Sequence, residues 1–300
     1  MSIDDNYVWP FLISAYSAKK YYLNLSRIIL VVDKTRLSVA NMAMIKKISK
    51  HMQIRLDFVF IELSNRLSQN LHISINAYAK IYYALKSSRN FVWIDSDTLL
   101  QKNWNLIFQN LEKPFLKKSI LVARPHWETL SISTYNMAYI SSKRNYFNAG
   151  VCIINPKKFK LQFSADYIED IYNKYEELNF QWSDQCVLNY LMEGIYDKLD
   201  KTFNSTPDEY ISSQTRIIHF IGQEKPWTSK QYKESLISSQ NNSSGYIFSA
   251  KDEAFNKYFL VEEEFVDFLE SRELDPKTRS QMQFLIDQSN VSPRPSTTLT

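Results

Sequence analysis

The chain has 300 residues, of which 44% are hydrophobic and 14% aromatic, so it can form one large domain or two small ones around a substantial core. Its net charge of +4 is mild, and charges of both signs are interspersed, which argues against a nucleic-acid-binding protein. With only 4 glycines it has no glycine-rich phosphate loop, and its longest apolar run is far too short to span a bilayer.

The cysteines and the first residues bear on the compartment. Cys152 and Cys186 do not have the spacing of a metal site, and we expect two reduced thiols. The N-terminal stretch MSIDDNYVWPFL is acidic and lacks the basic and long apolar regions of a signal peptide. We therefore expect a cytoplasmic protein, either free or weakly peripheral at the inner face of the membrane.

Short apolar runs alternate with longer helical patterns along the chain. Strands are predicted at residues 27–33, 54–63, 91–97, 119–125, 150–156 and 216–222. Helices are predicted at 37–52, with Ser38 as the N-cap, and at 74–88, 165–178 and 183–194. This alternation predicts a three-layer α/β domain with a mixed, largely parallel sheet.

The C-terminal part differs in composition. Residues 238–246 are typical of a linker, 254–270 of an acidic amphipathic helix, and 288–300 of a disordered polar tail. We therefore divide the chain into a main domain (1–245), a helical extension (246–286) and a disordered tail (287–300). The apolar face of the extension either packs on the main domain or meets a membrane or partner; its members are Phe255, Phe259, Phe265, Phe268 and Leu269.

Two carboxylates follow the apolar run FVWI at the predicted end of a buried strand. Asp95 and Asp97 are two residues apart, so in an extended segment their side chains point to the same side. In an open α/β sheet, ligands gather at the carboxyl ends of the strands, where two such groups can hold one hard cation. The alternative is a solvated loop that happens to carry two acids.

The segment HFIGQEKPW at 219–227 offers complementary groups. His219 is a nitrogen ligand, which favours Mn²⁺ over Mg²⁺. Gly222 allows a phosphate to approach the backbone closely, and Lys225 supplies a positive charge for it. The alternative for His219 is a core histidine whose hydrogen bonds are satisfied within the protein.

Three further segments carry polar groups at predicted element boundaries. Asn148 and Gly150 precede a buried strand, which is also the pattern of an ordinary turn. Asp184 and Gln185 lie in the first turn of a helix, where an acidic side chain also acts as a cap. The segment DDNY at 4–7 places polar groups at the chain start, where a frayed terminus is the alternative.

These segments, in this order, resemble glycosyltransferase family 8. The motifs are DDNY, HISINAYAKIYYAL, FVWIDSDTLL, YFNAGVCIIN, DQCVLN and HFIGQEKPW, and they extend from residue 4 to about 227. The family consists of retaining, metal-dependent enzymes of the GT-A fold, and includes relatives of bacterial lipopolysaccharide galactosyl- and glucosyltransferases and of glycogenin. The resemblance therefore implies a GT-A catalytic domain followed by a small helical region.

The resemblance also implies a role for each motif. It implies that Asp95, Asp97 and His219 bind Mn²⁺, with Mg²⁺ as the alternative. It implies that Asp184 and Gln185 lie beside the anomeric carbon as the catalytic pair. The residues implied to bind the UDP-sugar donor are Asp4, Asn6, Tyr7, Lys80, Asn148, Gly150, Gly222 and Lys225.

Two features depart from the family pattern. The family places a full strand before the DDNY segment, whereas only three residues precede it here. Either the first strand is absent or the natural chain starts upstream. The family also often has an acid after the Asp-Gln pair, where this chain has Cys186, so an acceptor contact or a supporting hydrogen bond is expected to be lost.

The expected activity is transfer of galactose or glucose from a UDP-sugar to a hydroxyl group of a glycan or glycolipid acceptor, with retention, in bacterial surface polysaccharide synthesis. Attack by Gln185 and same-face attack by the acceptor are both open. One alternative is a non-catalytic protein that binds a sugar nucleotide or glycan. Another is a metal-dependent nucleotidyl or phosphoryl transferase, although the additional acids or basic phosphate loop of such enzymes are not found.

Overall fold

The strands lie between two layers of helices in the computed structural model, which describes residues 1–62, 75–111, 120–122, 146–174, 183–192, 195–209, 211–222, 224–228, 232–236 and 249–289. The strands are β1 (Arg27–Asp33), β2 (Arg55–Ile61), β3 (Phe91–Ile94), β4 (Thr98–Leu100), β5 (Ile120–Val122), β6 (Val151–Ile154), β7 (Asp197–Lys198) and β8 (Ile217–His219). The α-helices are α1 (Val8–Tyr21), α2 (Val39–His51), α3 (Ala79–Lys86), α4 (Pro156–Gln162), α5 (Ala165–Asn173), α6 (Ser183–Met192), α8 (Ala250–Glu270) and α9 (Pro276–Ser289). The 3₁₀ turns are η1 (Asp5–Tyr7), η2 (Ile75–Tyr78), η3 (Trp104–Asn110), η7 (Lys201–Phe203) and η8 (Pro226–Thr228).

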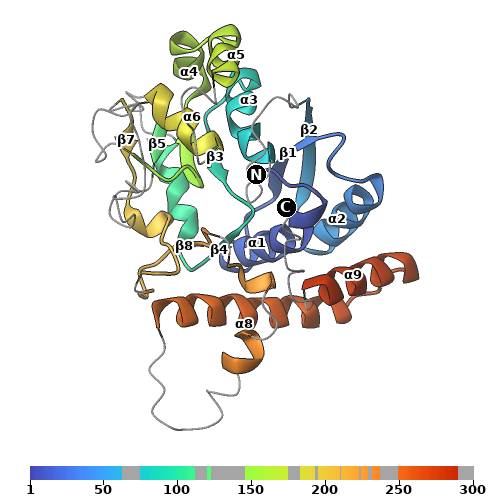
Figure 1. Ribbon diagram of the computed structural model, residues 1–300. Coiled ribbons are helices and arrows are strands. Elements are labelled where there is room, and N and C mark those ends of the chain that lie inside the picture. Colours follow the sequence, from blue (N-terminus) through green and yellow to red (C-terminus); the bar gives the residue numbers. More distant parts are fainter. Residues whose placement is uncertain are drawn as a thin grey trace, which may run out of the picture.

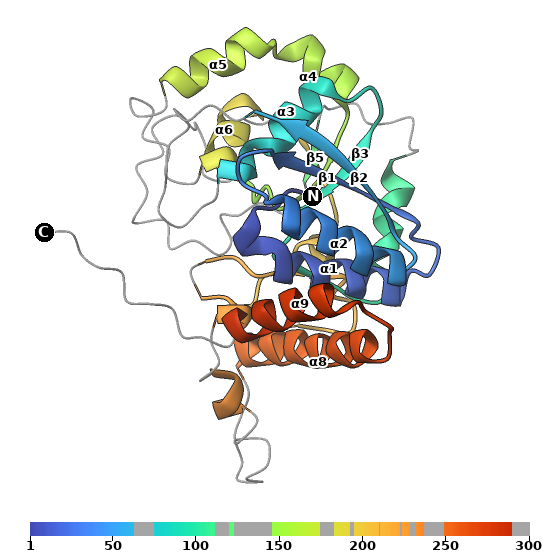
Figure 2. The same cartoon turned by 90° about the vertical axis from the view of Figure 1, so that its right-hand side faces the viewer.

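The helices form layers on both sides of the strands. Helices α3 to α6 lie on one side and α1 and α2 on the other (Figure 1). Helices α8 and α9 form a further layer that covers α1 and α2 (Figure 2), and contacts join α1 to both of them. The predicted three-layer α/β architecture with a helical C-terminal region is therefore confirmed.

The central strands are buried on both faces, which explains their continuous apolar runs. In β1, Leu30 and Val32 belong to the core beneath α1 and α2, whereas Val31 belongs to the core under α3 and α6. In β6, Ile153 and Cys152 are divided between the two cores in the same way. Successive side chains of a strand point to opposite faces, so a strand covered on both sides needs apolar residues throughout.

The sheet is mixed, with parallel and antiparallel pairs among the described strands. Strands β1 and β2 pair in parallel, as do β5 and β7. The pairs β3–β6, β5–β6 and β4–β8 are antiparallel. The partners of β3 and β4 come from far along the chain, and the alternation of strands and helices does not determine the direction in which such distant strands arrive. The predicted mixed sheet is therefore confirmed, and its antiparallel pairs are those formed with strands from far along the chain.

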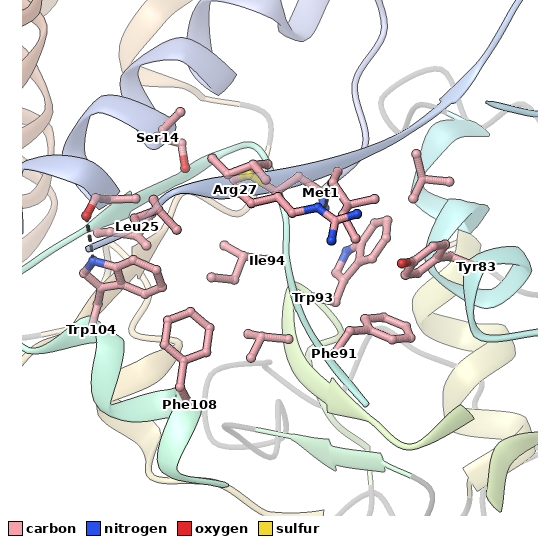
Figure 3. A pocket seen from close by; sticks show the side chains of 17 residues that line it. Met1, Ser14, Leu25, Arg27, Tyr83, Phe91, Trp93, Ile94, Trp104 and Phe108 are labelled. Carbon is pink, nitrogen blue, oxygen red and sulfur yellow. Dashed lines mark hydrogen bonds between the residues drawn. The ribbon is translucent and has the colours of Figure 1, made fainter. Parts of the chain in front are cut away.

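An apolar cavity separates the sheet formed by β1 and β2 from the sheet that contains β3. Strands β1 and β3 belong to different sheets among the described strands, and a cavity of about 190 Å³ lies between them (Figure 3). Its lining includes Ile29 of β1, Trp93 and Ile94 of β3, and Trp104 of η3. Among the described residues, no backbone ladder therefore joins β1 to β3.

Little strand pairing precedes η1. Ser2 forms an isolated parallel bridge with Val31, whose N–H donates to the carbonyl oxygen of Met1 at 3.0 Å. The terminal ammonium group of Met1 also donates to the carbonyl oxygen of Ile29 at 3.3 Å, so the segment before DDNY runs along β1.

Helix α1 was not predicted from the sequence. It is buried over most of its length, from Val8 to Ala15, so it lacks the alternation of polar and apolar faces that marks a surface helix. Its serines face the neighbouring strand, since Ser14 Oγ lies 3.1 Å from Thr98 Oγ1 and Ser17 Oγ accepts from the N–H of Leu100 at 3.1 Å. These hydrogen bonds satisfy hydroxyl groups that the buried helix would otherwise leave unpaired.

The C-terminal helices pack on the main domain, which decides between the two alternatives for their apolar face. Helix α8 begins with a capping box formed by Ser249 and Asp252. The ring of Phe265 lies 5.6 Å from that of Trp9 and 5.1 Å from that of Tyr16, measured between centroids. Among the described helices, none combines the length and the apolar character needed to cross a membrane.

The boundaries predicted for the C-terminal part stay predictions. The linker at 238–246 and residues 290–300 lie outside the described residues. Helix α9 continues to Ser289, so its last turn extends into the segment predicted as a tail. Residues of α8 and α9 share one hydrophobic core with α1 and α2.

Truncation of Phe265 tests the packing of α8. We expect Phe265→Ala to lower the free energy of unfolding by about 3–5 kcal/mol, because it removes a fully buried ring and leaves a cavity. Urea unfolding would measure the change, with Leu260→Ala as the control, since Leu260 lies on the same helix but is 52% exposed. Equal losses for the two variants would contradict this packing.

Candidate active site

The turn between β3 and β4 presents two carboxylates to one side. The N–H of Asp95 donates to the carbonyl oxygen of Gly150 at 2.8 Å, and the carbonyl oxygen of Asp97 accepts from the N–H of Phe220 at 2.9 Å. The backbone is therefore fixed at both acids. Their side-chain oxygens and a ring nitrogen of His219 all lie within 4.8 Å of one another. The solvated loop that was the alternative for these acids does not describe this arrangement.

The register of β4 and β8 brings His219 to the acids. His219 pairs with Thr98, the residue after Asp97, in the antiparallel β4–β8 ladder. Its Nε2 lies 3.3 Å from Asp97 Oδ1, and the side chain is almost fully buried. Two carboxylates and an imidazole are a donor set that suits Mn²⁺, and carboxylates alone would suit Mg²⁺. The residues present therefore fit a divalent cation.

Lys225 neutralises Asp97 from the loop after β8. Its Nζ lies 2.7 Å from Asp97 Oδ2 and also donates to the carbonyl oxygen of Phe220. Burial alone would raise the pKa of Asp97, but the charge of Lys225 and the interaction with His219 hold that pKa well below its usual range. Asp97 is therefore ionised at neutral pH.

Lys80 of α3 lies buried between the carboxylates of Asp95 and Asp184. Its Nζ is 2.8 Å from Asp184 Oδ2, 3.2 Å from Asp95 Oδ1 and 2.9 Å from the carbonyl oxygen of Ala149. Burial lowers the pKa of Lys80, but Asp184 and Asp95 outweigh burial and hold it above the ordinary lysine value. Burial raises the pKa of Asp184 above the ordinary carboxyl value, although Lys80 opposes that shift.

The amide of Gln185 is oriented by two hydrogen bonds. Its Oε1 accepts from the N–H of Ala149 at 3.2 Å, and its Nε2 donates to Tyr146 Oη at 3.2 Å. The same hydroxyl lies 3.4 Å from the thiol of Cys186, which is buried. Cys152 and Cys186 are both free thiols, as predicted.

The two predicted site glycines have different reasons to be glycine. A Cβ on Gly150 would lie 2.0 Å from Cε1 of His219, so the imidazole occupies the space that a side chain would need. Gly222 has open space around it but a φ of +85°, a conformation that other residues rarely adopt. Gly150 is therefore required for the close approach of His219, and Gly222 for the backbone of the loop.

The DDNY segment forms η1 at the edge of this cluster. Asp4 caps the turn by accepting from the N–H of Asn6 at 3.0 Å, and Asn6 is exposed. The ring of Tyr7 lies 6.1 Å from that of Trp227, between centroids, in an edge-on arrangement. Burial raises the pKa of Tyr7, and the negative charge of Asp97 raises it further. The segment is therefore ordered rather than frayed.

Sequence reasoning missed three residues that support the site. Trp93 Nε1 donates to Asp95 Oδ1 at 2.6 Å, and its place two residues earlier on the same strand is a signal that could have identified it. Tyr146 orients Gln185, and Asn204 lies 3.0 Å from Nδ1 of His219. No local pattern marks either of these two, because only the tertiary fold brings them to their partners.

A family comparison covers most of the chain. The family model described as "Glycosyl transferase family 8" matches residues 1–231. A Haemophilus influenzae protein whose name marks it as a suspected glycosyltransferase is 25% identical over 177 residues, or 53% of this chain. Glycogenin of Neurospora crassa is 26% identical over 133 residues, or 40% of this chain. The chain spans about half the length of the first relative (51%) and less than a fifth of glycogenin (18%).

Solved structures share the fold. The galactosyltransferase LgtC, in complex with donor and acceptor sugar analogues, is similar with a TM-score of 0.68 and 19% identity, covering 93% of this chain and 98% of that one. The glycosyltransferase GlyE of Streptococcus pneumoniae is similar with a TM-score of 0.57 and 17% identity, covering 89% of this chain and 63% of that one. At these identities the likeness shows the fold, which is the GT-A fold of glycosyltransferases.

Removal of the buried lysine tests the charge balance of the site. We expect Lys80→Met to lower the free energy of unfolding by about 3–5 kcal/mol at about pH 8, because Asp184 and Asp95 lose their buried partner. The loss should be smaller at about pH 5. A carboxyl whose pKa is raised by folding stabilises the folded state at low pH, and that contribution is lost as the pH rises through the raised pKa.

Denaturant unfolding at both pH values measures this difference. Lys47→Met is the control, because Lys47 pairs with Asp275 at the surface and its loss should change stability by less than about 1 kcal/mol at either pH. A destabilisation by Lys80→Met that does not depend on pH would show that the buried carboxyls are not what Lys80 stabilises.

Proposed function

Because the chain belongs to glycosyltransferase family 8, we propose that it transfers galactose or glucose from a UDP-sugar to a hydroxyl group of a glycan or glycolipid acceptor, with retention at the anomeric carbon. The observation that carries this proposal is the convergence of Asp95, Asp97 and His219 with two lysines and the Asp184–Gln185 pair. The complex of LgtC with donor and acceptor sugar analogues supports a two-substrate reaction.

The cation of this proposal is Mn²⁺, with Mg²⁺ as the alternative, held by Asp95, Asp97 and His219. A bound divalent cation supplies positive charge that stabilises the departing nucleoside diphosphate. The imidazole favours Mn²⁺ because Mg²⁺ prefers oxygen ligands throughout. The carboxylate of Asp97 remains an acceptor at neutral pH, since Lys225 beside it holds its pKa low.

The net charge of the site side chains is compatible with binding a divalent cation together with an anionic donor. At the core of the site, the carboxylates of Asp95, Asp97 and Asp184 face the ammonium groups of Lys80 and Lys225, which leaves one negative charge. Adding a divalent cation makes this group of charges positive, which suits a diphosphate. Lys225 is the lysine nearer the surface, and its flexible ammonium group can reach a phosphate as a point charge.

Gln185 and Asp184 are proposed to lie at the reacting sugar. The amide oxygen of Gln185 already accepts from the N–H of Ala149, and an uncharged amide is a poor nucleophile. This favours attack by the acceptor hydroxyl on the same face, with its proton taken by the leaving phosphate, over a covalent intermediate on Gln185. The ion pair with Lys80 holds the carboxylate of Asp184, which is proposed to accept a hydrogen bond from a sugar hydroxyl.

The remaining residues are proposed to bind the donor. Asn148 and Gly150 are assigned to the sugar, Asp4, Asn6 and Tyr7 to the uridine, and Gly222 to the diphosphate. The edge-on packing of Tyr7 and Trp227 supports a link between the uridine and diphosphate parts of the site. A bacterial surface polysaccharide is the proposed acceptor class.

Release of UDP from a panel of UDP-sugars tests this function. We expect slow hydrolysis of one donor with Mn²⁺ and loss of that activity with EDTA, since the diphosphate then lacks its cation. UMP or phosphate as the product would instead indicate a nucleotidyl or phosphoryl transferase. Binding of UDP without release of any product, even with acceptors added, would indicate a protein that only binds sugar nucleotides.

Substitution of Asp97 tests whether the activity depends on the group formed by Asp95, Asp97 and His219. We expect Asp97→Asn to lower turnover by on the order of 10²–10³-fold or more while the circular-dichroism spectrum stays unchanged, because the variant loses a carboxylate ligand of the cation that stabilises the departing diphosphate. Asp275→Asn is the matched control, as it removes a surface carboxylate paired with Lys47. Turnover of Asp97→Asn at the wild-type rate would sink the assignment of this site.

A further inference from the structure

Asn204 lies beside His219 because the next residue, Ser205, pairs with β8. The N–H of Ser205 donates to the carbonyl oxygen of Ile217 at 3.0 Å, and the carbonyl oxygen of Ser205 accepts from the N–H of His219 at 2.8 Å. This isolated bridge fixes the backbone that carries Asn204, whose side chain is fully buried. A buried amide in this position must find its hydrogen bonds inside the site.

The hydrogen bonds determine which atom of each amide faces which partner. The N–H of Gly150 lies 2.9 Å from Asn148 Oδ1, and a backbone N–H can only donate, so that atom of Asn148 is the oxygen. The amino group of Asn204 lies 2.9 Å from the same oxygen and donates to it. The oxygen of Asn204 therefore faces the imidazole of His219.

Two carbonyl oxygens consequently surround one nitrogen of His219. Asn204 Oδ1 lies 3.0 Å and Asn148 Oδ1 3.1 Å from Nδ1. Neither oxygen can donate, so Nδ1 carries the proton and shares it between them. In the neutral imidazole the other nitrogen, Nε2, then has a lone pair, and it lies 3.3 Å from Asp97 Oδ1.

This arrangement prepares His219 as a ligand. In the neutral, Nδ1-protonated imidazole this lone pair faces Asp97 Oδ1, so the two atoms can serve together as ligands of one cation. In the other tautomer, Nε2 would carry a proton and donate it to Asp97, which would remove the lone pair. The choice of tautomer therefore decides whether His219 can bind a cation.

We propose that Asn204 is a positioning residue which, together with Asn148, holds His219 in the Nδ1-protonated tautomer and thereby presents Nε2 to the cation. The cation part of this inference rests on the proposed function. The tautomer part concerns only His219 and its two amide partners, and can be tested without any cation.

Nitrogen-15 NMR of the histidine rings, without added metal, tests the tautomer directly. The chain has only 4 histidines, and His219→Gln identifies the signals of His219. We expect the wild type to show Nδ1–H and Asn204→Leu to show a population of Nε2–H, because leucine removes one of the two oxygens beside Nδ1. Asn204→Ala removes the same oxygen with a smaller side chain and is the second variant if the leucine variant does not fold.

Calorimetric titration with Mn²⁺ alone, without nucleotide, gives the second readout. We expect Asn204→Leu to bind Mn²⁺ about 10–100-fold more weakly than the wild type. Asn189→Leu is the matched control, since Asn189 is a buried asparagine whose amide bonds the backbone of Phe147 and Gln185. It should lower stability without changing the His219 signals or the affinity for Mn²⁺.

The outcomes separate this inference from the proposed function. Nε2–H in the wild type, or an Asn204→Leu variant that keeps both Nδ1–H and an affinity within about twofold of the wild type, would overturn the role of Asn204. A wild type that binds no Mn²⁺ would refute the proposed cation, and the NMR comparison would then decide the positioning role by itself.

Discussion

Three carboxylates that approach one another beneath the protein surface need positive charge beside them, and much of the structure serves that need. Asp95, Asp97 and Asp184 come from two separate segments, and burying an unpaired charge is costly. The compensating groups, Lys80 and Lys225, come from α3 and from the loop after β8. Opposite charges therefore connect elements that lie more than a hundred residues apart in sequence.

The backbone makes this arrangement specific. The antiparallel register of β4 and β8 places His219 opposite Thr98 and thus beside Asp97. The absence of a side chain at Gly150 leaves room for the imidazole. A slip of one residue in the ladder would point His219 to the opposite face of the sheet. The geometry therefore gathers the small group of residues on which the proposed transfer reaction rests.

Sequence reasoning predicted the elements whose environment leaves a local signal. The bounds of β1 agree with its apolar run, and Ser38 caps α2 as predicted, with its Oγ accepting from the N–H of Asn41. Helix α1 and the direction of the later strands were not predictable, because uniform burial removes the periodicity of a helix and distant pairing has no local pattern. The Asp-x-Asp spacing similarly predicted carboxylates on one side, whereas Asn204 depends on a tertiary contact. The roles assigned to the site residues remain predictions.

Anomalous diffraction from crystals containing Mn²⁺ and UDP would test the central claim most directly. Data collected above and below the manganese absorption edge locate the ion without assumptions about its ligands. We predict one strong peak bonded to Asp95, Asp97 and His219 and to the diphosphate of UDP. Well-ordered UDP with no peak at these residues, or with the peak at other side chains, would contradict the account.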